Sequence, residues 1–172
     1  MKLNPYVNKM SKKHFQKTVD LYMNPYYDTV LSTLNIIVPS NQYSHKKDDR
    51  GQLILNPPTK GVREFEYWMK EEYLKKINAF GWPLKGDLFV LLDIRLTKKE
   101  YSIKDVDNIA RSLIDSMKGI VFDDDVQICS LIIVKSIDDV PGFVIAIKCI
   151  KDADDRRNVM KIHGPISDKP YQ

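Results

Sequence analysis

Cysteine, histidine and long apolar runs are scarce in this chain of 172 residues, and each scarcity excludes a class of protein. Two cysteines and three histidines leave no zinc-type ligand spacing and no disulfide framework. No apolar run is long enough to span a bilayer, and the N-terminus MKLNPYVNKMSKKHF lacks the apolar core of a secretion signal. Cys129 and Cys149 lie in strand-like apolar runs, which is typical of buried reduced thiols. We therefore expect a cytoplasmic protein with no membrane partner.

Charge is present in both signs but is unevenly distributed along the chain. The formal net charge is +4. Residues 1–20 carry five lysines against one aspartate, and residues 43–63 carry five basic residues against two aspartates. Residues 104–127 reverse this balance, with six aspartates against three basic residues. Solvated charge clusters would explain this pattern, and so would a metal-dependent enzyme that acts on a polyanion.

Hydrophobic periodicity predicts a single α+β domain with one mixed sheet and two main helices. We expect strands over 34–38, 53–55, 89–96, 126–134 and 143–150, and helices over 62–80 and 108–118. The segment 126–134 is apolar on both faces near its middle, which favours a central strand. The turn 138–142 predicts a hairpin between the last two strands. The domain is expected over 31–151, after a basic N-terminal arm (1–30) and before a polar, loosely held C-terminal tail (152–172).

Two aspartates open the acidic region, in the sequence Asp105-Val106-Asp107. In an extended segment both carboxylates would face one side and Val106 would turn into the core. Asp107 also precedes a predicted helix, so it has a second interpretation as the helix N-cap. Capping explains Asp107 and leaves Asp105 unexplained.

The predicted helix carries Asp107, Arg111 and Asp115 at intervals of four residues. This spacing is typical of exposed ion pairs between successive turns. It would also place Arg111 above metal-binding acids, directed at a phosphate.

Three further aspartates, Asp123 to Asp125, form a turn before the next predicted strand. If that strand adjoins the segment leading to Asp105, then Asp125 could converge with Asp105 and Asp107. Carboxylates without a nearby histidine or cysteine favour Mg²⁺ or Mn²⁺. A calcium loop does not fit, because Ile109, Ala110 and Ser116 occupy the positions of a ligand, the glycine and the glutamate.

The spacing over 104–135 resembles that of the RusA family of Holliday-junction resolvases. The residues that carry this resemblance are Asp105, Asp107, Asn108, Arg111, Asp115, Gly119, Asp124, Asp125, Gln127 and Lys135. The resemblance implies a small homodimeric α+β endonuclease, common in phages and prophages, that uses Mg²⁺ or Mn²⁺ to cut branched DNA symmetrically. It implies that Asp105, Asp107 and Asp125 bind the metal and that Arg111 assists them. Asn108, Asp115 and Asp124 would support these residues, and DNA would contact Lys12, Lys13, Lys46, Lys47 and Lys135.

Arg111 departs from the family pattern, which usually has a lysine at this position. Arginine can neutralise a phosphate, but its pKa is too high for ready proton donation. If the family's lysine acts electrostatically, Arg111 suffices; otherwise Lys104, Lys118 or Lys135 must substitute. Two other hypotheses stay open: a DNA-binding protein that has lost catalysis, and a domain whose acids bind metal only for stability.

Overall fold

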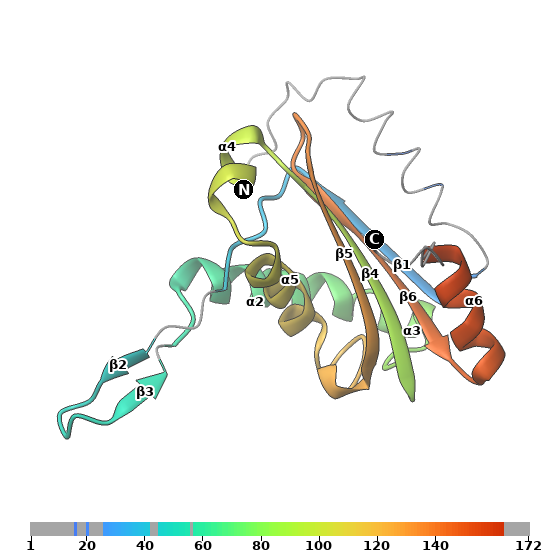
Figure 1. The fold of residues 1–172 in the computed structure, drawn as a ribbon, viewed down its shortest axis with the longest axis horizontal. Coiled ribbons are helices and arrows are strands. Elements are labelled where there is room, and N and C mark those ends of the chain that lie inside the picture. The colour runs from blue at the N-terminus through green and yellow to red at the C-terminus, as the bar shows by residue number, and fades with distance from the viewer. Residues whose placement is uncertain (1–15, 17–19, 21–25, 42–44, 56, 164–172) are drawn as a thin grey trace, which may run out of the picture.

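The computed structural model describes residues 16, 20, 26–41, 45–55 and 57–163 (Figure 1). Most of the predicted N-terminal arm, including Lys12 and Lys13, lies outside these residues, as does the segment 164–172. None of the described helices is both long enough and apolar enough to cross a membrane. The strands are β1 (Thr29–Leu34), β2 (His45–Lys47), β3 (Leu53–Leu55), β4 (Asp87–Leu96), β5 (Ile128–Ile137) and β6 (Gly142–Ile150). The helices are α2 (Lys60–Leu74), α3 (Ile77–Phe80), α4 (Lys98–Ile103), α5 (Val106–Met117), the 3₁₀ turn η1 (Asp125–Gln127) and α6 (Ala153–His163).

A four-stranded mixed sheet in the order β1-β6-β4-β5 forms the centre of the molecule. β4 pairs antiparallel with β6 and parallel with β5, and β1 pairs antiparallel with β6. Helices α2 and α5 lie together on one side of this sheet, and the β2–β3 hairpin projects away from it (Figure 1). The predicted α+β domain with a mixed sheet is confirmed.

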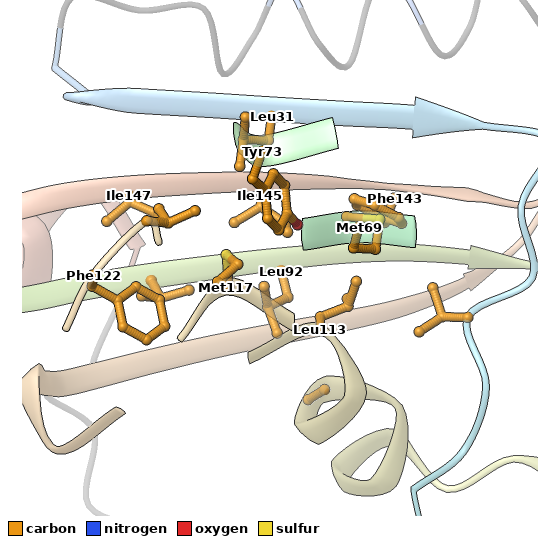
Figure 2. Packing of buried hydrophobic residues seen from close by; sticks show 14 of the residues in the cluster. Leu31, Met69, Tyr73, Leu92, Leu113, Met117, Phe122, Phe143, Ile145 and Ile147 are labelled. Atoms are coloured by element: carbon orange, nitrogen blue, oxygen red, sulfur yellow. The ribbon is translucent and has the colours of Figure 1, made fainter. Parts of the chain in front are cut away.

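The main core lies between the sheet and the helices α2 and α5 (Figure 2). β4 places alternate residues toward the helices, because successive side chains of a strand point to opposite faces. These residues pack with the apolar stripes of both helices, and burial of each large side chain contributes about 1.5–3 kcal/mol. The fully or almost fully buried members are Leu88, Val90, Leu92, Ile94 and Leu96 of β4, Phe65, Met69 and Tyr73 of α2, and Ile109, Leu113 and Met117 of α5.

The position of β5 differs from the sequence prediction in two ways. β5 was expected to be central and to form a hairpin with β6, but it lies at the sheet edge and β4 separates it from β6. The apolar residues at its middle are partly buried on both faces: Ile133 packs against the main core, and Ile132 packs against Phe89, Leu91 and Ala146 on the other face of the sheet. Helices α4 and α5 form the crossover that a parallel β4–β5 pair requires. The short 138–141 link then joins β5 to β6 at the end of β4, where the Asp138 amide donates to the Leu96 carbonyl (2.8 Å).

Three other segments also differ from their predicted structures. The first strand ends at Leu34, because Asn35 adopts a positive φ of 59°, so 35–38 are not the expected strand. The helix predicted over 62–80 is divided into α2 and α3, with Lys75 and Lys76 between them. The polar segment after Asp152 forms α6 instead of a loosely held tail; Arg156 pairs with Asp87 of β4 at 2.9 Å.

Gly142 begins β6 at a point where the β1 backbone leaves no room for a side chain. A Cβ atom there would lie 2.4 Å from the Thr33 carbonyl oxygen. We expect Gly142→Ala to lower the free energy of unfolding by about 1–3 kcal/mol, because the strands must separate to admit the methyl group. Urea denaturation measures this change. Gly61→Ala in α2 is the control, since its Cβ would meet nothing within 4 Å; equal stability of the two variants would contradict the explanation.

Candidate active site along helix α5

Helix α5 has a buried apolar face and a polar face. Its apolar face packs into the main core, so the helix cannot rotate without exposing Ile109 and Leu113, which are fully buried. Asp107, Arg111 and Asp115 follow one another at the four-residue spacing that places them on one face. Lys118, at the C-cap, continues this row. The helical rise places Lys118 about 16 Å along the axis from Asp107.

Asp105, rather than Asp107, is the N-cap residue of α5, and its side chain makes no capping hydrogen bond. Asp105 has extended backbone angles (φ −76°, ψ 140°), and its carbonyl accepts from the Ile109 amide at 3.2 Å. Asp107 lies in the first helical turn, where a negative charge is favoured by the helix dipole. Val106 is already helical and is 36% exposed, so the expectation that it turns into the core was wrong. Both carboxylates lie on exposed residues at the beginning of the helix.

The segment 38–41 runs along α5 and is joined to it by hydrogen bonds. The backbone amide of Asn41 donates to the backbone carbonyl of Asn108 at 3.0 Å. The Ser112 hydroxyl donates to the backbone carbonyl of Pro39 at 2.8 Å. The buried Asn41 side chain donates to the Asp115 carboxylate at 3.2 Å. Asn41 had no role in the sequence prediction; the turn-forming run Pro39-Ser40-Asn41 was its only signal.

Asp115 is half-buried beneath this segment. Burial raises the pKa of its carboxyl group, and the charge of Asp125 adds to that increase. The hydrogen bond from Asn41 and the charges of Arg111 and Lys118 act in the opposite direction and lower this pKa. Asp115 therefore connects Arg111 electrostatically to the acidic turn that follows the helix.

The β2–β3 hairpin carries the basic residues that were predicted to contact DNA. It follows Asn41 in the chain after the undescribed residues 42–44, and Lys46 and Lys47 are exposed on it. Its turn is held by Asp48, whose carboxylate accepts from the Arg50 and Gln52 amides at 2.9 and 2.8 Å.

Lys135, the other described lysine of the predicted DNA contact, lies on β5. Its ammonium group donates to the carbonyls of Tyr101 and Lys104 at 3.1 and 2.9 Å and lies 4.3 Å from the centre of the Tyr101 ring. In this structure Lys135 therefore joins β5 to the end of α4.

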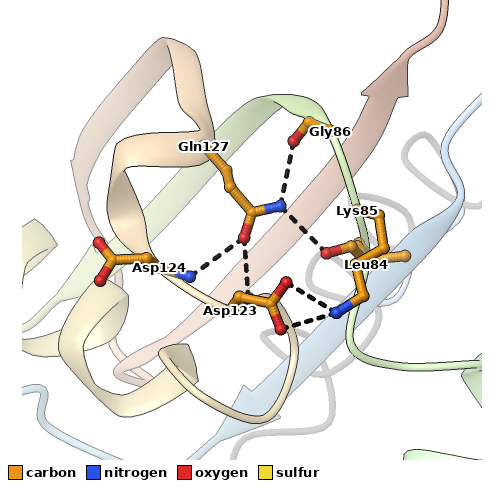
Figure 3. A network of polar contacts seen from close by, with 6 residues as sticks. All are labelled: Leu84, Lys85, Gly86, Asp123, Asp124 and Gln127. Atoms are coloured by element: carbon orange, nitrogen blue, oxygen red, sulfur yellow. Dashed lines mark hydrogen bonds and ion pairs between the residues drawn. The ribbon is translucent and has the colours of Figure 1, made fainter.

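Gln127 holds the acidic turn against the loop that precedes β4 (Figure 3). Its side-chain oxygen accepts from the Asp123 and Asp124 amides at 2.8 and 3.0 Å. Its side-chain nitrogen donates to the Leu84 and Gly86 carbonyls, both at 3.1 Å. Gln127 was part of the predicted pattern without an assigned role, since only the fold brings these four backbone groups together.

The carboxylates of Asp124 and Asp125 share a single cation, Lys118. Its ammonium nitrogen lies 2.9 Å from an oxygen of each. The hydrogen bond from Lys118 is the main cause that lowers the pKa of Asp124, and the two carboxylates raise the pKa of Lys118. Asp125 is the first residue of η1 rather than of the strand, because β5 begins only at Ile128.

The residue types of the predicted metal centre fit a hard cation, since all three ligands are carboxylates. Asp105 and Asp107 lie at the start of α5, whereas Asp125 follows its C-terminal end and is paired with Lys118. Within the described part of the chain, no group of three or more His, Cys, Asp or Glu side chains is arranged to hold a metal ion. Binding of a metal by Asp105, Asp107 and Asp125 therefore stays a prediction.

The four hydrogen bonds of Gln127 predict a measurable role in stability. Gln127→Met keeps the approximate side-chain size but leaves two amides and two carbonyls without this partner. We expect the free energy of unfolding, measured by urea denaturation, to fall by about 1–3 kcal/mol. Gln52→Met on the exposed hairpin is the matched control. An unchanged stability of Gln127→Met would show that water replaces these bonds at no cost.

Comparison with known proteins identifies the family. The family model described as "Endodeoxyribonuclease RusA" matches residues 37–148. A search of curated proteins finds no match. The matched region runs from the segment beside α5 through β6 and contains the whole acidic pattern, from Asp105 to Lys135. Because the match covers more than half of the chain, this protein belongs to the RusA endodeoxyribonuclease family.

Proposed function

We propose that this protein is a metal-dependent endonuclease that resolves four-way DNA junctions by symmetric hydrolysis of phosphodiester bonds in the cytoplasm. Membership of the RusA family indicates an endonuclease that acts on DNA junctions. The observation that carries the proposal is the position of Asp105 and Asp107. They begin α5 next to Asn108, whose carbonyl binds Asn41 on the segment that leads into the basic hairpin. The acidic residues therefore lie beside the segment from which the chain continues to the basic hairpin.

The proposed cofactor is Mg²⁺ or Mn²⁺, with Asp105, Asp107 and Asp125 as its ligands. Such an ion, when bound, would activate water and polarise the phosphate. In the overall reaction the water oxygen bonds to phosphorus, the bond to the leaving oxygen breaks, and a water proton ends on that oxygen. Arg111 lies one turn beyond Asp107, so its guanidinium group can neutralise charge that develops on the phosphate.

The proposed DNA contacts are phosphate contacts. Lys46 and Lys47 are exposed on the projecting hairpin, and Lys12 and Lys13 are assigned the same role from the sequence. Such contacts carry no base specificity and weaken as salt rises, because binding releases counterions from DNA. They therefore suit recognition of junction shape rather than of sequence.

A homodimer is proposed because two symmetric cuts require two active sites. The edge strand β5 supports it. Among the described strands β5 pairs only with β4, and Leu131, Val134 and Ile137 on it are 39–57% exposed. A ten-residue apolar edge with a single charged residue invites pairing with another strand. A second copy placed about a two-fold axis would cover it with the same surface.

Asp107→Asn tests the proposed active site. We expect at least a hundredfold loss of cutting of a synthetic four-way junction with Mg²⁺ or Mn²⁺, because a ligand charge is removed. Junction binding in a gel-shift assay should be kept or strengthened, because a charge that repels phosphate is lost. Asp139→Asn, in the exposed turn before β6, is the matched control and should cut normally.

Two results would contradict parts of this proposal. Normal cutting by Asp107→Asn would show that the site is assigned wrongly. Junction binding by the wild-type protein without cutting at any divalent-ion concentration would favour the alternative, a catalytically inactive junction-binding protein of the same fold.

Val134→Lys tests the dimer interface. A lysine on each β5 strand would place like charges at the interface, so we expect the dimer dissociation constant to rise at least tenfold in sedimentation equilibrium. Leu74→Lys, at the exposed end of α2, should leave association unchanged. Dimerisation of Val134→Lys with unaltered affinity would place the interface elsewhere.

A further inference from the structure

Helix α4 leads directly into Asp105, yet none of its six residues is buried (Figure 1). A helix this short is not stable by itself. Its first turn is capped by Thr97, whose hydroxyl accepts from the Glu100 amide at 3.3 Å. Because α4 has no apolar residue in the core, the position of its C-terminal end depends on polar contacts with other elements.

Lys135 of β5 supplies two of these polar contacts. Its ammonium group donates to the carbonyls of Tyr101 and Lys104 at 3.1 and 2.9 Å and lies over the Tyr101 ring. The last carbonyls of a helix have no partner within that helix, and the helix dipole favours a cation at this end. Lys135, which follows Lys104 by 31 positions, therefore caps the C-terminus of α4.

Lys104 joins the same end of α4 to the segment 38–41. Its ammonium group donates to the Val38 carbonyl at 2.6 Å and pairs with Glu100 at 2.8 Å, and its side chain is only 14% exposed. Lys104 and the partly buried Lys135 thus direct their charges at oxygen atoms of the protein itself. This arrangement contrasts with Lys46 and Lys47, which are exposed on the hairpin.

The backbone of Asp105 is restrained on both sides of its Cα atom. The Lys104 carbonyl and the Asp105 amide belong to one planar peptide group, so the bond from Lys135 restrains the plane that precedes this Cα atom. The following plane is restrained by α5, because the Asp105 carbonyl accepts from the Ile109 amide at 3.2 Å. Together the two planes determine the direction of the Cα–Cβ bond that carries the Asp105 carboxylate.

We propose that Lys135 is a positioning residue of the active site: by capping α4 it orients Asp105, and it does not contact DNA. This inference rests on the proposed function in taking Asp105 as an active-site residue. The sequence pattern assigned Lys135 to the DNA contact, whereas its bond to the Lys104 carbonyl gives the same charge a role within the protein. Loss of the ammonium group would release the 104–105 peptide and with it the orientation of Asp105.

Amide hydrogen exchange in the full chain, without DNA or divalent ions, measures whether Lys135 restrains this region. In Lys135→Met the amides of 101–109 should exchange on the order of fivefold faster, as expected when local opening no longer breaks these bonds. Lys135→Arg keeps a cation with several N–H donors and should exchange like the wild type. Lys99→Met is the matched control, because it removes the same charge from an exposed position of α4. If Lys135→Met does not fold, Lys135→Gln supplies the same comparison.

Cutting of a synthetic four-way junction measures whether this restraint serves the active site. With Mg²⁺ and the protein in excess, the single-turnover rate of Lys135→Met should fall by about ten- to a hundredfold, because Asp105 is misplaced. The dissociation constant of the junction without divalent ions, and its dependence on salt, should stay unchanged. Lys135→Arg should recover most of the rate, and Lys99→Met should cut like the wild type.

Three results would overturn the proposal. Unchanged exchange of 101–109 in Lys135→Met would show that Lys135 does not restrain Asp105. Weaker junction binding, with a salt slope reduced by about one, would show that Lys135 contacts a phosphate. An unchanged cutting rate, with or without a lower melting temperature, would show that the role of Lys135 is structural alone.

Failure of the proposed function has a different signature. A wild-type protein that cuts no junction would disprove that function. The exchange of 101–109 in Lys135→Met would still decide whether Lys135 orients Asp105.

Discussion

Packing of the apolar stripe of α5 against β4 is the constraint on which the rest of the structure depends. Ile109, Leu113 and Met117 are fully buried in the same cluster as Leu92. Rotation of the helix would expose these side chains and leave cavities, each a cost of several kcal/mol. The opposite face of α5 is therefore fixed as well. The packing of the apolar face therefore determines the direction in which the polar row of α5 points. The charged side chains of that row are not needed for this.

Contacts from two distant parts of the chain complete the surroundings of that row. The segment 38–41 covers one side of α5 and directs the basic hairpin away from it. The turn 123–127 is held at the C-terminal end by Gln127 and Lys118. Gln127 binds backbone groups through its neutral side chain, whereas Lys118 forms an exposed ion pair.

Local periodicity predicted α5 well, because this helix buries one face, and a continuous apolar run predicted β4, because this strand is buried on both faces. It misplaced β5, because apolar residues on both faces of a strand do not distinguish a central strand from an edge strand beside a crossover. It also misplaced the first strand, where the positive φ of Asn35 ends the pairing before the apolar run 36–38. The buried Val38 and the partly buried Ile36 instead pack into the main core from an irregular segment, whereas Ile37 is exposed.

The sequence by itself determined the fold class, the family and the polar row of α5, because helical spacing and residue order are local properties. Only the tertiary structure decided which distant groups meet. Asn41 reaches Asp115 across 74 positions, and Gln127 reaches Leu84 across 43. The same holds for the N-cap of α5: spacing allowed Asp107, whereas the folded backbone placed Asp105 there. These features depend on which distant segments of the chain pack together. Packing of the whole core, rather than local sequence, determines that arrangement.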